Sequence, residues 1–171
     1  MIDVAYVQRM ARYNRWQNDN LIGVANRLSD EERRQQRGAF FGSIHGTFNH
    51  LLWADTMWLS RLVGTAKPTA SLAESAALCP DWDTFKHERD ACDARMEQWA
   101  RELNDDHLKS DLSWFSGAIK ADVTKPMWIV VAHIFNHQTH HRGQIHAMLT
   151  QAGGKPGDTD LFIMPEQPIH V

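Results

Sequence analysis

The stretch from His133 to Gly153, HIFNHQTHHRGQIHAMLTQAG, decides the fold. At about 100° per residue, an α-helix gathers one set of side chains from this region on a single face. The set comprises Val130, Ile134, His137, His141, Ile145 and Met148. We expect this helix to be capped by Thr124, to begin at Pro126, since proline suits a first helical turn, and to end near Gln151.

Two histidines on that face indicate a metal site. His137 and His141 are four residues apart, so their imidazoles lie one turn above the other and can bind one ion. Burying such rings without partners costs roughly 1–3 kcal/mol each, whereas a metal uses their lone pairs. A second predicted helix supplies His50, whose neighbours on that helix are small: Gly46, Thr47 and Ala54. His45 lies more than a quarter turn from His50 and is a weaker candidate.

The predicted ligand set is His50, His137 and His141, holding one divalent transition metal. Three neutral imidazoles suit Zn, Ni, Fe or Co, whereas Mg and Ca prefer oxygen ligands. Three protein ligands also leave one coordination position open, as in catalytic zinc sites. Gln138 follows His137, so the glutamate base of His-Glu-x-x-His enzymes is absent.

Three more segments have helical periodicity, at residues 3–28, 43–63 and 82–103. Ser43 and Asp81 are good N-cap residues for the second and third segments. Residues 29–41 are predicted to form a loop and residues 65–80 a long connection. The stripe on the third segment makes Cys92 a core residue.

Residues 108–124 have the pattern of a short extended stretch with a turn at Gly117, which favours a short hairpin before the last helix. The prediction is an all-α fold: a four-helix bundle with one long crossover connection and a candidate hairpin. The length of 171 residues fits a single domain, residues 1–171.

Composition excludes several classes of partner. A net charge of −3 gives no reason to expect nucleic acid or an anionic membrane. No stretch approaches the roughly 18 apolar residues of a membrane span, and the N-terminal segment lacks the apolar core of a secretory signal. The two cysteines, Cys79 and Cys92, form no CxxC pair, which favours a reducing, cytoplasmic location.

Other polar residues are candidates for the surroundings of the metal. Asn14 and Gln17 interrupt the apolar seam of the first helix, either at an exposed end of the seam or as an inward-facing pair near a polar site. With Gln144, they are candidates to orient the ligands or contact substrate. His133 and His140, at the edge of the histidine face, are candidate general bases. His146 and His170 are expected to be ordinary hydrogen-bonded or exposed residues.

The sequence resembles the DinB-like (damage-inducible) superfamily of four-helix-bundle metalloproteins. The resemblance rests on four stretches: YNRW (13–16), SIHGTFNHLLWAD (43–55), the block 133–153 and GDTDL (157–161). It implies a metal bound by His50, His137 and His141, and frequent homodimers. Some relatives in the wider superfamily are metal-dependent transferases that use low-molecular-weight thiols such as bacillithiol or mycothiol.

Three functions follow as hypotheses. The first is a metal-dependent enzyme of the small-thiol S-transferase or hydrolase type, acting on a thiol and a small electrophile, because an open-sided metal generates a nucleophile at neutral pH. The second is a non-catalytic metal-binding structural or sensory protein. The third is an interaction module whose histidine cluster arises from packing alone.

The apolar patterning also predicts a homodimer. The last helix is apolar on the side away from His137, with Trp128, Val131, Phe135 and Leu149, and the second helix repeats this with Phe48, Leu52 and Leu59. A helix that is apolar nearly all round must be buried on both sides. A two-fold partner is the commonest way to cover such a face.

Overall fold

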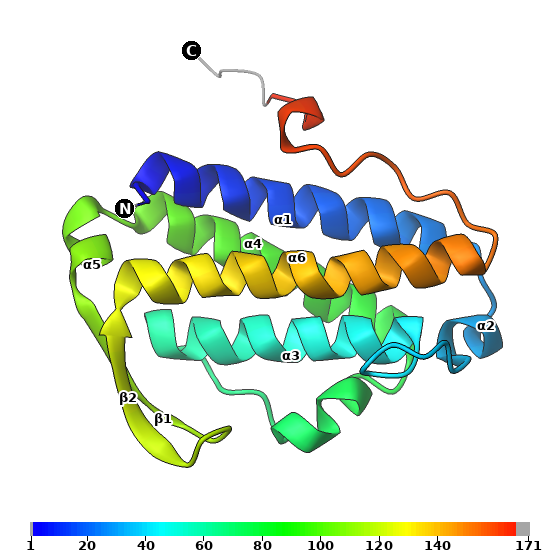
Figure 1. The fold of residues 1–171 in the computed structure, drawn as a ribbon, viewed down its shortest axis with the longest axis horizontal. Helices are drawn as coiled ribbons and strands as arrows, with labels where there is room; N and C mark the ends of the chain where they lie inside the picture. Colours follow the sequence, from blue (N-terminus) through cyan, green and yellow to red (C-terminus); the bar gives the residue numbers. More distant parts are fainter. Residues whose placement is uncertain (1, 167–171) are drawn as a thin grey trace.

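Four long helices form the body of the protein. The computed structural model describes residues 2–166, so His170 lies outside the described residues. The long helices are α1 (Val4–Ala25), α3 (Ile44–Val63), α4 (Trp82–Glu102) and α6 (Met127–Gln151). Each of α1 and α3 packs against both α4 and α6. In Figure 1, α1 and α6 run in one direction and α3 and α4 in the other. The predicted all-α bundle is confirmed.

Short elements connect the long helices. These are α2 (Asp30–Arg34), the 3₁₀ helix η1 (Leu72–Ala77), α5 (Asp105–Lys109), the strands β1 (Asp111–Ser116) and β2 (Ala121–Pro126), and the 3₁₀ helix η2 (Leu161–Ile163). The long crossover joins the parallel helices α3 and α4 and contains η1 (Figure 1). Between α4 and α6, the two strands pair as the predicted antiparallel hairpin. No helix within residues 2–166 is both long enough and apolar enough to cross a membrane.

Side chains next to the helix ends explain where the helices start. Ser43 accepts a hydrogen bond from the backbone N–H of Gly46, and Asp81 accepts one from Thr84, as expected of N-caps. Gly64 ends α3 in the left-handed conformation, with φ of 72°. The last helix begins at Met127, one residue after the predicted start, and Thr124 is not its cap. Thr124 pairs with Ser113 in the hairpin, and Pro126 ends β2 immediately before α6.

The loop predicted at residues 29–41 contains the helix α2. Ser29 and Glu32 form a reciprocal capping box, the arrangement that stabilises a short helical turn without an apolar stripe. Asn104 likewise accepts a hydrogen bond from the backbone of His107 at the start of α5. Periodicity misses these elements because five residues are too few to display a helical repeat.

The second apolar faces of α3 and α6 are buried within one chain. Phe48 packs against Phe85 of α4, and Phe135 packs edge-on against Tyr6 of α1. Six of the seven residues that suggested a dimer are at most 2% exposed: Phe48, Leu52, Leu59, Val131, Phe135 and Leu149. The seventh, Trp128, is partly exposed. The bundle itself therefore covers the faces that we had assigned to a partner, and the homodimer prediction loses this support.

A buried polar network runs through the core between α1, α3, α4 and α6. Its centre is Arg89, which is 2% exposed and contacts Asp55 at 2.9 Å and Asp93 at 2.8 Å. Asn18 donates to Asp93, and Gln138 donates to Asp55. Burial by itself would lower the pKa of Arg89, but the Asp93 and Asp55 carboxylates outweigh it, so the guanidinium stays charged.

Candidate metal centre

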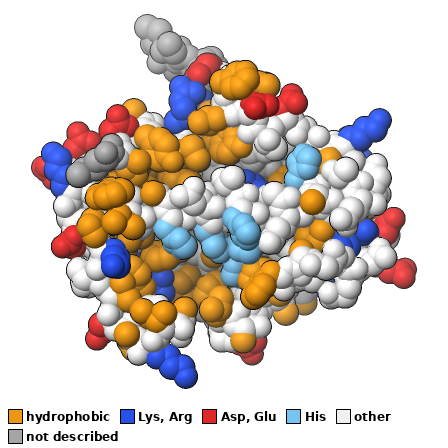
Figure 2. All heavy atoms as spheres, viewed as in Figure 1, with side chains coloured by type: hydrophobic (Ala, Val, Ile, Leu, Met, Phe, Trp, Pro, Cys, Tyr) orange, Lys and Arg blue, Asp and Glu red, His pale blue; other side chains and the backbone are white. Residues whose placement is uncertain are grey.

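His50, His137 and His141 come together in the groove between α3 and α6. One nitrogen from each ring lies within 4.8 Å of the other two, and the Nε2 atoms of His50 and His137 are 3.2 Å apart. A tetrahedral zinc ion with Zn–N bonds of about 2.0–2.1 Å requires nitrogens about 3.3 Å apart. The distance between His50 and His137 matches that value, and the three rings together form a cluster that could hold a metal ion. In Figure 2, the histidines gather at the centre of the face that is shown.

A hydrogen bond sets the tautomer of His141, and another orients the ring of His50. His141 Nδ1 lies 2.9 Å from Gln144 Oε1, and because an amide oxygen only accepts, Nδ1 carries the proton and Nε2 has the free lone pair. His50 Nδ1 lies 3.0 Å from Ser75 Oγ, a hydroxyl that can donate or accept, so this contact orients the ring without fixing which nitrogen carries the proton. Ligating histidines in proteins are normally oriented by such a partner on the second ring nitrogen.

Burial keeps the three imidazoles neutral. Together with a smaller effect of the neighbouring histidines, it lowers the pKa of His50 to about 3 and that of His137 to about 4. The pKa of His141 is also lowered, chiefly by burial, although the hydrogen bond to Gln144 opposes the shift. At neutral pH all three rings therefore offer lone pairs, which is the state that metal binding requires.

Phe41 covers His50 because Gly46 has no side chain. The rings of Phe41 and His50 stack with centroids 3.7 Å apart. A Cβ at residue 46 would lie 2.5 Å from the backbone oxygen of Phe41, so only glycine admits the Phe41 backbone here. Gly46, which was predicted to leave space for an ion, thus makes room for the preceding loop instead. Of the small residues near His50, Ala54 lines a cavity.

The remaining candidates on α6 have distinct surroundings. Gln144 contacts both His141 and His140, since its Nε2 lies 3.2 Å from His140 Nε2. His133 packs edge-on against Trp58, with its ring centroid 5.8 Å from that of His137. Burial lowers the pKa of His133 as well.

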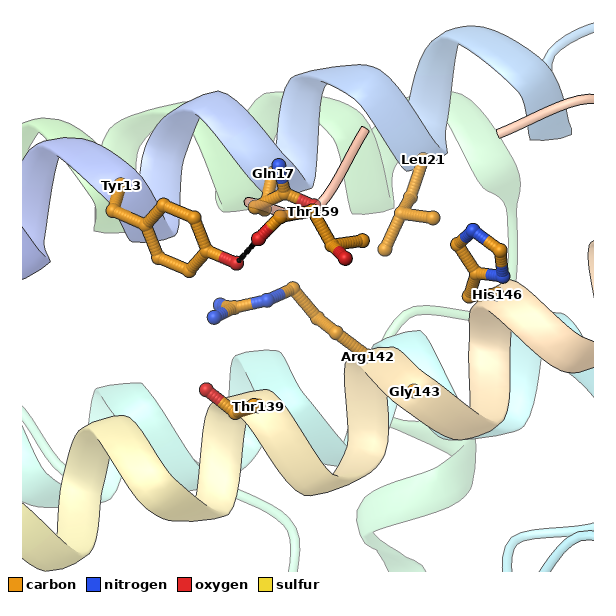
Figure 3. A pocket seen from close by; sticks show the side chains of 8 residues that line it. All are labelled: Tyr13, Gln17, Leu21, Thr139, Arg142, Gly143, His146 and Thr159. Carbon is orange, nitrogen blue, oxygen red and sulfur yellow. Dashed lines mark hydrogen bonds between the residues drawn. The ribbon is translucent and has the colours of Figure 1, made fainter. Parts of the chain in front are cut away.

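Asn14 and Gln17 are buried, so they form an inward-facing pair and not an exposed end of the seam. Their hydrogen bonds, however, lead away from the histidine cluster. Asn14 accepts from Arg142, and Gln17 donates to the backbone oxygen of Asp158 in the C-terminal segment. Gln17 lines a cavity of about 360 Å³ between α1 and α6, with Arg142 reaching across it and His146 at its edge (Figure 3). His45 is also separate, because its buried ring packs against Trp82 and Phe85 of the core.

A larger cavity of about 900 Å³ opens beside the histidines. His50 and His137 line one part of it, and α3, α6, the hairpin and the segment around η1 form its walls. Most wall residues are apolar: Trp53, Met57, Trp58, Leu72, Trp114, Ile119, Val123, Ile129 and Val130. Below the pale-blue histidines in Figure 2, hydrophobic side chains surround a hollow in this face. A small molecule can therefore lie next to the donor atoms.

Ser75, Phe41 and this cavity were not predicted from the sequence. Ser75 lies in the crossover that we had treated as a featureless connection. The sequence SLAES at residues 71–75 contains a signal for structure there, because Ser71 and Glu74 form a capping box at the start of η1. The cavity depends on how the hairpin folds back on α3, which no local pattern encodes.

Comparisons with known proteins agree with this architecture. The DinB family model matches residues 1–168. Protein DinB of Bacillus subtilis (strain 168) is 28% identical over 165 residues, which cover 94% of this chain and 92% of that protein. The crystal structure of a DinB-like protein from Bacillus cereus ATCC 10987 superposes with a TM-score of 0.57 at 21% identity, over 85% of this chain and 90% of that one. With the match running along almost the whole chain, the protein belongs to the DinB family.

Proposed function

We propose that the protein binds one divalent transition metal through His50, His137 and His141, as an enzyme of the small-thiol transferase or hydrolase type. One observation carries the proposal: two of the three clustered histidines also line a cavity of about 900 Å³. A purely structural metal site is normally closed by four protein ligands, whereas a catalytic site keeps a position open to substrate.

A metal bound here would lower the pKa of a water or thiol held at its open position. The residues of the chain supply the rest. Ser75 and Gln144 hold two ligand rings in orientation, and Phe41 shields His50 from solvent. The apolar wall places a second reactant beside the histidines and excludes water from it.

His133 is the better supported of the two candidate general bases. It lines the cavity, and its lowered pKa leaves the imidazole neutral and able to accept a proton at pH 7. His140 does not line the cavity, and the Gln144 amide occupies one of its ring nitrogens. We therefore assign proton transfer to His133 and an orienting role to His140.

Elemental analysis of protein purified without a polyhistidine tag tests the metal site. About one equivalent of a transition metal is expected in the wild type, with a sharp loss in each of the variants His50→Ala, His137→Ala and His141→Ala. His146→Ala is the matched control, because this histidine lies on the same helix but borders the other cavity. A His50→Ala variant with the metal content of the wild type would overturn the three-ligand site.

Turnover tests the catalytic part. The metal-loaded protein should consume a thiol and an electrophile together, or hydrolyse an ester, at a rate that chelation abolishes. His133→Gln should reduce that rate while leaving the metal content unchanged. Stoichiometric metal without turnover of either class would favour the structural or sensory alternative instead.

A further inference from the structure

We propose that the cavity beside the histidines takes an elongated, mainly apolar molecule with an anionic group, and that Arg61 binds that group at the end away from the histidines. The inference rests on the proposed function in that it assigns this cavity to the substrate. It adds the substrate class, which neither the ligand set nor the family membership specifies.

The charges of the lining residues favour an anion. Two cationic side chains line the cavity, Arg61 from α3 and Lys125 from β2, and no Asp or Glu is among the described residues that form its wall. Neither cation forms an ion pair with a carboxylate within residues 2–166. This local balance is opposite to the net charge of −3 for the chain.

Two tryptophan rings hold the Arg61 guanidinium in position, and within residues 2–166 its N–H groups donate no hydrogen bond. Its guanidinium lies 4.5 Å from the ring centroid of Trp58 and 5.6 Å from that of Trp114. Stacking of this kind fixes the plane of the group while leaving its edge N–H donors available. Partial burial lowers the pKa of Arg61, which shows that the charge has lost part of its hydration. A carboxylate or similar anion would restore it through a charge-assisted, bidentate contact.

The helix sets the length of the ligand. Arg61 follows His50 by eleven residues, three turns plus about 20°, so both lie on one stripe of α3 separated by about 16 Å along the axis. Ala54 and Met57 lie between them on that stripe, and both line the cavity. A molecule that reaches from the histidines to Arg61 therefore passes over an apolar floor for most of its length.

The opposite walls are also apolar. Trp114 and Val123 face each other across the hairpin in register, and both point into the cavity. Trp58 packs edge-on against Trp114 and closes the end near Arg61. A strongly polar ligand would lose hydration along these walls without gaining hydrogen bonds, so the body of the ligand should be hydrocarbon or aromatic.

Isothermal titration calorimetry with dodecanoate, below its micelle concentration, tests the proposal. Its extended chain is comparable in length to the distance from His50 to Arg61. Dodecyltrimethylammonium provides the same chain with the opposite charge, and glutathione provides a polar, anionic thiol. Each probe is titrated into metal-loaded and metal-free protein, because a carboxylate can also bind a metal directly.

Dodecanoate should bind both forms, and Arg61→Met should weaken binding about 10- to 100-fold, the effect of losing one hydrogen-bonded charge pair. The control is Arg101→Met, which removes an exposed arginine of α4 and should change nothing. Met57→Trp, which fills the floor without altering charge, should abolish binding.

Equal affinity of wild type and Arg61→Met, or tighter binding of dodecyltrimethylammonium or glutathione than of dodecanoate, would overturn the inference. Its failure is distinguishable from failure of the proposed function. Protein that binds metal at the three histidines but not dodecanoate refutes the substrate class alone. Protein that binds dodecanoate through Arg61 but holds no metal refutes the metal enzyme alone.

Discussion

Replacing Arg89 by methionine should destabilise the protein strongly at neutral pH. Arg89 is the cation between Asp55 and Asp93, and all three side chains are at most 3% exposed. Methionine approximates the length of the arginine stem, so the change removes charge and hydrogen bonds while preserving much of the packing. Two carboxylates are then left in the core without their counter-ion.

The expected loss is about 3–5 kcal/mol in the free energy of unfolding, the range measured when one partner of a buried ion pair is removed. For a chain of this size, 1 kcal/mol corresponds to about 2–4 °C, which gives a fall of about 6–20 °C in Tm. Burial already raises the pKa of Asp55, and Arg89 lowers it. Without Arg89 that pKa rises further. A carboxyl with a raised folded-state pKa loses stability as pH increases through that value, so the deficit should be smaller at pH 5 than at pH 7.

Urea denaturation followed by circular dichroism at both pH values measures the effect. Arg95→Met is the control, an exposed arginine on the same helix, and should stay within about 0.5 kcal/mol of the wild type. A loss below 1 kcal/mol for Arg89→Met, or an equal loss at pH 5 and pH 7, would refute the account of Arg89 as the essential counter-ion of the core.

Three further predictions concern other residues. Ser75→Ala should weaken metal affinity about 10- to 100-fold in a competition titration with a chelator, because His50 loses the partner on Nδ1; unchanged affinity would show that Ser75 does not orient the ring. Burial lowers the pKa of His45 to about 4, and neither ring nitrogen has a hydrogen-bond partner within the described residues. Because this pKa lies below the unfolded value of about 6.5, the wild type loses stability as pH falls below about 6.5. His45→Leu should therefore become more stable relative to the wild type between pH 7.5 and pH 5. Equal pH profiles of the two proteins in thermal melts would contradict this. The homodimer stays a prediction based on the family resemblance: light scattering should give twice the chain mass of 19.6 kDa, and a concentration-independent mass near 19.6 kDa would exclude it.

Local patterns were sufficient to predict the long helices and the histidine cluster. Asp81 and Ser43 mark helix starts through one hydrogen bond each, and the four-residue spacing of His137 and His141 needs only one helix to bring the rings together. Bringing His50 to this pair required the packing of two helices, and of the small residues near His50 only Ala54 lines the cavity.

The partners of Arg89 in the buried polar network could not be predicted from local sequence patterns. Arg89 lies on the stripe formed by Phe85, Cys92 and Met96, four residues after the first and three before the second. A charged residue in an apolar stripe signals a buried counter-ion, yet nothing local says which helix supplies it. The identity of Asp55 as its partner, like the contact of Ser75 with His50, depends on tertiary packing between segments distant in sequence.

The cavity is assembled from two kinds of structure that differ in how readily they can change. The helices α3 and α6 carry the histidines, and their opposite sides are locked into the core. The hairpin and the η1 segment form the far wall and are connections between helices, although Ser75 of η1 contacts His50 and the backbone of Ala70 accepts a hydrogen bond from Trp53. Residues 71–73 and 114–123 line the cavity without a hydrogen bond or ring contact to His50, His137 or His141, so they can vary without disturbing the histidine cluster. Exchange of these two segments between family members offers a route for one bundle to acquire different substrates during evolution, and a compact target for directed libraries.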